Sequence, residues 1–290
     1  MSRDDRPLVF LIALAAALLI LGPCAHAETV KCDLTDGTTL YADMSASNVY
    51  AGEIPPSIRV WVDFSDNANL TLVSTTHISV ANNKAGSEQF GQGTDANRPT
   101  VVSGGALGGR QCADFASQFL TLDSPICTGT SGEVWVAYDT DSSTTTNQAL
   151  YCEANNSTTV YAVSYAIGSV SGKPAWAVSA TTDVLRATNS ISTDTATLTR
   201  IASSGTTTTI ELNGTAETVV VTAGANDGDW FGDAGATQRT GIGAYYHNTT
   251  TQVLNGQIGE IVVIDGATLV TWQATQLRTY LSKKWAVSVP

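Results

Sequence analysis

The residues best suited to chemistry in this chain are its carboxylates, because two of them flanking a glycosidic bond can hydrolyse it. Glucan hydrolases of β-sandwich fold place three acids on one strand face as E-x-D-x-x-E. No E-x-D occurs in the sequence: Glu133, Glu153, Glu211 and Glu260 are all followed by other residues. The G-x-S-x-G nucleophile motif is also absent. We therefore expect no catalytic residue, and a glycoside hydrolase that lacks the usual motif is the third hypothesis for function.

A second group of carboxylates lies on one loop, Gly224–Gln238, with the sequence GANDGDWFGDAGATQ. Its Asp227, Asp229 and Asp233 are close together in the chain, and oxygen ligands gathered on one loop can hold Ca²⁺. The loop is therefore a candidate calcium site, and no other cofactor is expected. The alternative is a solvated acidic loop whose Trp230 packs against the rim of the fold.

Aromatic residues near this loop are candidates for sugar binding, which needs an aromatic face for stacking and amides or carboxylates for hydrogen bonds. Function tends to collect on loops above a rigid scaffold. The candidate ligand-binding residues are Trp230, Tyr245, Tyr246 and Asn248. Other aromatic residues fit core or half-buried strand positions better, since packing is the usual role of such side chains in a sandwich: Trp61, Trp135, Trp176 and Tyr151.

Four cysteines follow the N-terminal segment: Cys32, Cys112, Cys127 and Cys152. An even number of cysteines in an exported protein favours two disulfides, and the sequence leaves all three pairings open. Structural zinc is the competing interpretation. It is disfavoured because there is no C-x-x-C and the histidines of the same region, His77 and His247, are far apart in the sequence.

The N-terminus has the pattern of a signal peptide, residues 1–27. A short charged segment is followed by the apolar run Leu8–Gly22, and Ala25-His26-Ala27 supplies an A-x-A cleavage site. The apolar run is too short and wrongly flanked for a membrane span, so none is expected in the mature chain. A lipoprotein interpretation through Cys24 is disfavoured by Pro23. The protein is expected to be exported, to a periplasmic or extracellular location.

The charge balance limits the partners. Fourteen Lys and Arg residues face 26 Asp and Glu residues, a net charge of −12. Such a chain lacks the basic patch that a phosphate backbone requires, so nucleic acid is not an expected partner. With 43% hydrophobic residues the chain can bury a full core.

Short alternating segments at regular spacing predict an all-β sandwich or barrel. Ile58–Phe64 alternates between two faces and Glu133–Tyr138 is a second strand candidate, and Asn213-Gly214 is typical of a tight hairpin turn. Near the end, Gln257–Ile264 predicts a strand buried on both faces. A helix is expected after it, with Thr271 as its N-cap and one apolar stripe that packs on the β-structure: Leu277, Tyr280, Leu281 and Trp285.

A series of motifs in the same order resembles bacterial and phage laminin-G-like (concanavalin A-like) domains. The resemblance covers nearly all of residues 52–287 and implies a jelly-roll β-sandwich of two antiparallel sheets with a short C-terminal helix. It also implies that Glu260 marks the end of the last core strand and has a structural role. The matching segments are Ile58–Asp66, Asn82–Gly86, Asn97–Thr100, Gly109–Leu122, Leu212–Gly214, Leu254–Ile261 and Tyr280–Trp285.

These observations predict residues 28–51 as an N-terminal strand region that packs on the sandwich, and residues 52–290 as one laminin-G-like domain. Proteins of this fold have many different functions, so the function has to be inferred from the residues of the binding site and not from the fold. The leading hypothesis is a secreted, non-catalytic module that binds a glycan or another cell-surface or matrix component. The alternative is a structural protein of an extracellular or virion-associated assembly, which binds other protein subunits.

Overall fold

The computed structural model describes residues 29–33, 39–43, 57–103, 105–141, 147–156, 160–168, 172–179, 182–247 and 250–290. The chain divides into two compact units, Met1–Ile54 and Pro55–Pro290. In the first, β1 (Thr29–Asp33) and β2 (Thr39–Asp43) form an antiparallel pair. The predicted signal peptide lies outside the described residues, and the packing of residues 28–51 on the sandwich stays a prediction.

The second unit is an antiparallel β-sandwich with one α-helix among its described residues, which confirms the predicted fold class. Sheet I has the strand order β16 (Thr208–Leu212), β15 (Thr197–Ser203), β10 (Gly132–Thr140), β22 (Gly256–Asp265) and β3 (Ile58–Asp63). Sheet II has the order β9 (Leu120–Leu122), β19 (Arg239–Ile242), β11 (Gln148–Ala154), β12 (Tyr161–Ile167), β13 (Ala175–Val178), β14 (Asp183–Arg186) and β18 (Val220–Ala223).

Shorter elements join the two sheets. The linking strands are β4 (Leu70–Val73), β5 (His77–Asn82), β6 (Gln89–Gly91), β7 (Thr100–Ser103) and β8 (Gln111–Asp114), with 3₁₀ turns η1 (Asn67–Asn69) and η2 (Asp95–Asn97) between them. The remaining pieces are β17 (Thr215–Ala216), paired with β16, and the small hairpin of β20 (Tyr245–Tyr246) and β21 (Thr250–Thr251). At the turn between β16 and β17, Asn213 and Gly214 have φ values of 50° and 79°, as the predicted tight turn requires.

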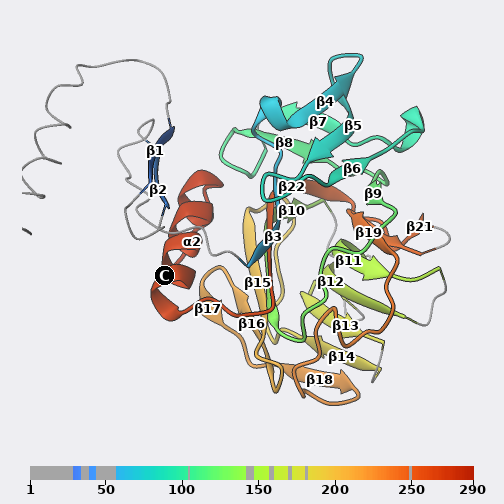
Figure 1. The fold of residues 1–290 in the computed structure, drawn as a ribbon, viewed down its shortest axis with the longest axis vertical. Coiled ribbons are helices and arrows are strands. Elements are labelled where there is room, and N and C mark those ends of the chain that lie inside the picture. The colour runs from blue at the N-terminus through green and yellow to red at the C-terminus, as the bar shows by residue number, and fades with distance from the viewer. Residues whose placement is uncertain are drawn as a thin grey trace, which may run out of the picture. The chain divides into compact units, whose positions relative to one another are not determined.

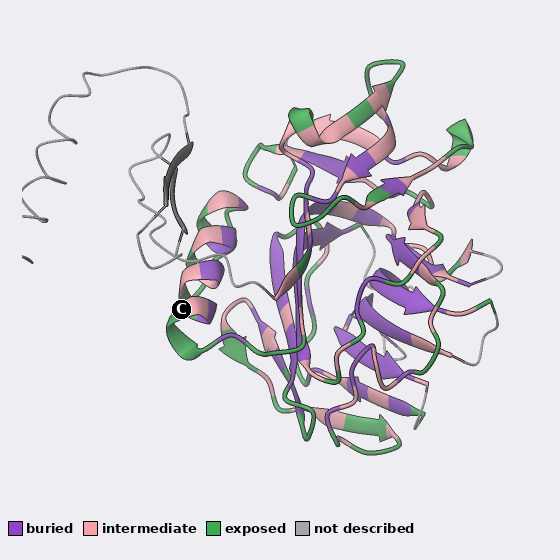
Figure 2. Ribbon diagram, in the orientation of Figure 1, coloured by how far each residue is buried: buried purple, intermediate pink, exposed green. Residues whose placement is uncertain are grey.

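Strand β10 explains the layering, because both of its faces are covered. Val134, Val136 and Tyr138 point into the core between the two sheets, where they meet side chains of β11 and β13. Trp135 and Ala137 point the other way, into a second cluster beneath helix α2 (Thr271–Lys284). Figure 1 shows the same order, with α2 on one side of β10 and β15 and strands β11–β14 on the other. Buried residues accordingly concentrate on the central strands (Figure 2).

Helix α2 docks through the residues predicted from its spacing. Leu277, Leu281 and Trp285 are buried, and Trp285 lies directly over Gly259 of β22, where a Cβ atom would come within 2.6 Å of its ring. The predicted cap is wrong by one residue: Val270 is the N-cap, and the helix begins at Thr271. A valine side chain cannot accept a hydrogen bond from the first turn of the helix. The Gln273 side chain instead reaches back, and its Oε1 accepts a hydrogen bond from the Val270 amide at 3.3 Å. No helix in the described part of the chain is long and apolar enough to cross a membrane.

Glu260 binds this helix to sheet I. It is fully buried, and its two oxygens accept hydrogen bonds from Trp61 Nε1 (2.6 Å), Tyr280 OH (3.1 Å), Lys284 Nζ (2.8 Å) and Trp285 Nε1 (2.9 Å). Lys284 also lies 2.7 Å from Asp63. Burial alone would raise the pKa of Asp63, but the charges of Lys284 and Lys84 hold that pKa below its ordinary value. A buried acid with this many partners is part of the scaffold.

The outer edge of β3 is closed by one side chain from the Asn82–Gly86 loop. Asn83 Oδ1 accepts from the Trp61 amide at 2.8 Å, and its Nδ2 donates to the Arg59 carbonyl at 2.8 Å, so the amide stands in for a neighbouring strand. We expect Asn83→Ala to lower the free energy of unfolding by about 2 kcal/mol, because it removes the hydrogen bonds to the part-buried Trp61 amide and Arg59 carbonyl. Urea denaturation measures this. Asn82→Ala should change it by less than about 0.5 kcal/mol, and equal losses would contradict this role.

The prediction of two disulfides is wrong. Cys112, Cys127 and Cys152 are buried free thiols, whereas two disulfides among the four cysteines would require a bond between two of these three. The reason is their placement. Cys112 lies beneath α2, Cys127 in the core between the sheets, and Cys152 on the opposite face of sheet II, so a layer of structure separates each pair. Burial raises the thiol pKa of Cys112 and of Cys152 to about 12. The side chain of Cys32 lies outside the described part.

Candidate functional site

The loop Gly224–Gln238 folds inward rather than presenting an aromatic face. Trp230 is fully buried, with its ring stacked on that of Trp176 at a centroid distance of 5.0 Å and its Nε1 donating to Asp265 at 3.1 Å. The ring of Phe231 packs edge-on against Trp230 at 4.9 Å. The prediction that Trp230 stacks on a sugar is therefore wrong: the end of the core has space for both rings, and burying them removes a large apolar area from water.

The acidic residues of the same loop only partly form the predicted cluster. Among the described residues, the carboxylates that come within 4.8 Å of one another are those of Asp183, Asp227 and Asp229. Asp233 is not in this group, because its Oδ2 accepts the Trp230 amide at 2.9 Å inside the turn. Asp183 comes from β14, so the loop sequence alone could not identify it.

The electrostatics of this cluster favour a cation. Asp227 is exposed, and some loss of hydration together with the neighbouring charges of Asp229 and Asp183 raises its pKa. Asp183 Oδ1 is already engaged by the Ala225 amide at 2.6 Å. Oxygen donors of this type suit Ca²⁺, so Asp183, Asp227 and Asp229 are the residues that would hold it. Calcium binding itself stays a prediction.

The two adjacent tyrosines have different environments. Tyr245 is 5% exposed and packs edge-on against Tyr161 at 5.3 Å, so its predicted role as a sugar-stacking face is wrong. Tyr246 is half-buried, and its hydroxyl donates to Asp123 Oδ1 at 3.1 Å. Asn248, the fourth predicted residue, lies outside the described residues. Of the three predicted residues that the structure describes, only Tyr246 is thus placed beside an open pocket.

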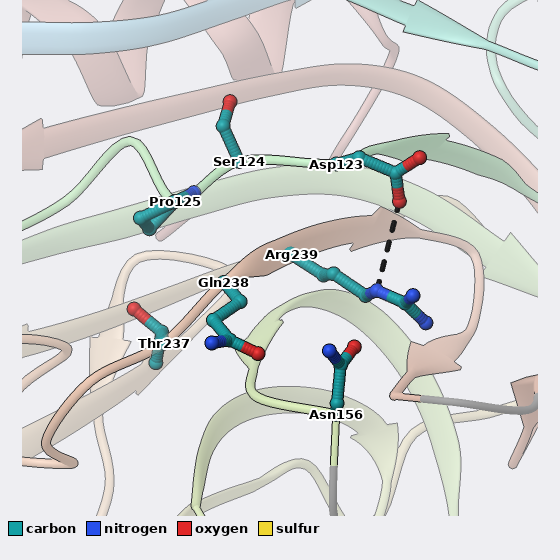
Figure 3. Close-up of a pocket in the computed structure, with 7 residues that line it drawn as sticks. All are labelled: Asp123, Ser124, Pro125, Asn156, Thr237, Gln238 and Arg239. Atoms are coloured by element: carbon teal, nitrogen blue, oxygen red, sulfur yellow. Dashed lines mark ion pairs between the residues drawn. The ribbon is translucent and has the colours of Figure 1, made fainter.

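That pocket lies where three segments of sheet II meet, and we call it the strand-end pocket (Figure 3). Its volume is about 550 Å³, and it is lined by residues that follow β9, follow β11 and lead into β19: Asp123, Ser124, Pro125, Asn156, Thr237, Gln238 and Arg239. The register explains the meeting point. Arg239 pairs with Ala154 of β11, and Thr240 pairs with Leu122 of β9, so the polar ends of three neighbouring strands come together at one edge.

Arg239 is the most constrained side chain of the pocket. Its Nε lies 3.6 Å from Asp123 Oδ1, as the dashed line in Figure 3 marks, and its Nη1 donates to the carbonyl of His247. Its guanidinium carbon also lies 5.0 Å from the centroid of the Tyr246 ring. The side-chain ends of Gln238 and Asn156 turn toward the same space (Figure 3). The pocket therefore offers a cation, a carboxylate and two amides to a polar ligand.

The residues missed by sequence reasoning are those of the pocket, notably Asp123, Asn156 and Arg239. One signal was present: polar residues directly before or after predicted strands mark the edge of a sheet. Sequence reasoning also missed Trp272, which is 52% exposed on α2. The strand glutamates Glu133, Glu153 and Glu260 are fully buried.

No family model matches this chain, and no curated protein matches it. Domain 4 of AbnA, a GH43 extracellular arabinanase from Geobacillus stearothermophilus, in complex with arabinotriose, has a TM-score of 0.49 at 14% identity, covering 79% of this chain and 98% of that one. The CBM40 of the Ruminococcus gnavus IT-sialidase, bound to alpha2,3 sialyllactose, has a TM-score of 0.46 at 12% identity, covering 62% and 95%. Trypanosoma rangeli sialidase has a TM-score of 0.48 at 9% identity, covering 80% and 34%. At TM-scores below 0.5, these similarities assign neither residue roles nor an activity to this chain.

Proposed function

We propose that this protein is an exported, non-catalytic module of laminin-G-like type that binds carbohydrate in the strand-end pocket. The observation that carries the proposal is the convergence of amide, carboxylate and guanidinium groups there, with Arg239 held against the ring of Tyr246. The signal-peptide pattern of residues 1–27 supports export.

Sugar recognition fits the chemistry of these groups. A sugar presents several hydroxyls that both donate and accept, and the amides of Asn156 and Gln238 do the same. Asp123 adds an acceptor and Arg239 adds charged donors, which form stronger hydrogen bonds than neutral ones. Because Arg239 is already fixed by three contacts, little side-chain entropy is lost when a ligand binds.

The carboxylate arrangement supports binding rather than hydrolysis. Asp123 is the single carboxylate among the pocket residues, whereas most glycoside hydrolases place two carboxylates around the scissile bond. Glu133, Glu153 and Glu260 are fully buried, so a substrate in the pocket has no access to these three strand glutamates.

A glycan array followed by titration calorimetry tests the proposal. We expect Arg239→Ala to weaken binding of the recognised glycan at least tenfold, about 1.4 kcal/mol, because a charged donor is lost. Arg98→Ala is a matched control, since Arg98 also pairs with an exposed aspartate, at 2.8 Å from Asp95. Running the array with Ca²⁺ and with a chelator tests the calcium prediction in parallel.

One observation favours the alternative function, a structural or interaction protein. Val270 and Trp272, at the start of α2, are 54% and 52% exposed. Large apolar side chains that are exposed to water are available for contacts with another protein. Absence of glycan binding, together with concentration-dependent oligomers that Trp272→Ala abolishes, would favour this alternative over carbohydrate binding.

A further inference from the structure

One wall of the strand-end pocket is held in place by a buried carboxyl. Directly after the lining residue Pro125, the amides of Ile126 and Cys127 donate to Glu153 Oε1 at 3.2 Å and 2.9 Å. The hydroxyl of Tyr151 donates to the same oxygen at 2.9 Å. Glu153 lies on β11 and is fully buried. The position of the wall Asp123–Pro125 therefore depends on a residue that does not itself reach the pocket.

The next two amides of this loop are held by another acid. Thr128 donates to Asp265 Oδ2 at 2.9 Å, and the Gly129 amide lies 3.1 Å from both oxygens of the same carboxylate. Four consecutive backbone donors are thus shared between two carboxyl groups. Asp265 is part-exposed at the end of β22, whereas Glu153 is fully enclosed, and burial of this kind disfavours the charged form of a carboxyl group.

The surroundings of Glu153 stabilise a negative charge poorly. Its Oε2 has no hydrogen-bond partner among the described residues, and no ion pair there involves it. Burial raises the pKa of Glu153 to about 7, even though the Cys127 amide, the Tyr151 hydroxyl and the Ile126 amide oppose the shift. The titratable groups that face it are the Cys127 thiol and the Tyr151 hydroxyl, and the charge of Asp265 acts on Cys127. Burial raises the pKa of both, so both stay protonated near neutral pH.

If the loop Asp123–Gly129 opens, water reaches the Glu153 carboxyl group. The pKa of Glu153 then falls toward its ordinary value. Protons bind more tightly to the closed loop than to the open one. By linkage, lowering the pH favours the closed loop, and raising the pH through the folded-state pKa favours the open loop.

We propose that Glu153 is a positioning residue that makes this wall of the pocket proton-controlled: the protonated carboxyl keeps the loop Asp123–Gly129 closed, and the ionised carboxyl releases it. The consequence for ligand binding rests on the proposed function of the pocket. The consequence for the loop does not.

Amide hydrogen exchange of the full-length protein tests the inference without any ligand. After correction for intrinsic exchange, the opening constant of the amides of Ile126 and Cys127 is expected to rise on the order of twentyfold between pH 5.5 and 8. Glu153→Gln should remove the rise, because the glutamine is neutral at both pH values. Asp265→Asn, the matched control, should increase opening at every pH and keep the wild-type pH profile.

A flat wild-type profile would overturn the inference, as would an equal rise in Glu153→Gln. Failure of the proposed function appears differently, as a lack of glycan binding at every pH while the exchange profile is unchanged. The two failures are thus separable.

Discussion

Replacing Trp285 by alanine is expected to lower the free energy of unfolding by about 4 kcal/mol, the range for deleting a large buried aromatic side chain. Trp285 is fully buried against Gly259, and its Nε1 donates to Glu260 Oε2 at 2.9 Å. Its removal leaves a cavity between α2 and sheet I and takes one partner from a buried carboxylate. Urea denaturation monitored by circular dichroism measures the loss.

One further variant separates packing from hydrogen bonding, and a second is a control at an exposed position of the same helix. Trp285→Phe retains much of the ring and loses the Nε1 donor, so a loss of about 1–2 kcal/mol is expected. Trp272→Ala, at the exposed start of the same helix, should cost less than about 0.5 kcal/mol. Glycan binding should persist in folded Trp285→Ala, because the pocket belongs to sheet II. A Trp285→Ala protein as stable as the wild type would mean that α2 does not dock as described.

The second large effect is a fall in stability as the pH rises from about 4.5 to 8. Burial raises the pKa of Glu153 to about 7, and burial together with the charges of Asp141, Asp194 and Asp114 raises that of Asp139 to about 6. A carboxyl whose folded-state pKa is raised binds its proton more tightly in the folded protein. Its contribution is therefore greatest at low pH and is lost as the pH rises from the unfolded-state value through the folded-state value.

The expected size follows from about 1.4 kcal/mol per pKa unit. Glu153 should account for about 3 kcal/mol, and Asp139 for about 2 kcal/mol after screening by nearby water. The opposite sign applies to Asp63, whose lowered pKa makes its contribution disappear only in more acidic solution. Stability should therefore peak at mildly acidic pH.

Thermal and urea denaturation across this pH range measure the fall. The double variant Asp139→Asn/Glu153→Gln should remove most of it, whereas Asp95→Asn, at an exposed carboxylate, should leave it unchanged. A wild-type stability that is constant, or that rises, between pH 5 and 8 would contradict the assignment of these two buried acids.

The fold was predictable because its signals are local. The β-branched and aromatic residues of Glu133–Tyr138 suit a strand that is buried on both faces, and Asn213-Gly214 suits positive φ at both turn positions. The spacing of Leu277, Leu281 and Trp285 likewise reports one buried helix face. Each pattern depends on residues a few positions apart.

The site was less predictable, because its members depend on tertiary packing. An aromatic residue in an acidic loop can point either way, and Trp230 turns inward because Trp176 and Phe231 provide a surface for it. Asp183 joins Asp227 and Asp229 only through the pairing of β14 with β18 and the turn that follows. The pocket depends in the same way on the meeting of β9, β11 and β19. The cysteine count gave no information on which layer each thiol occupies.

Carbohydrate binding in the strand-end pocket is tested most directly by titrating an array-identified glycan into wild type, Arg239→Ala and Arg98→Ala. We expect saturable binding to the wild type, at least a tenfold loss of affinity in Arg239→Ala, and wild-type affinity in Arg98→Ala. Absence of binding to any glycan, or equal affinity in all three proteins, would contradict this expectation.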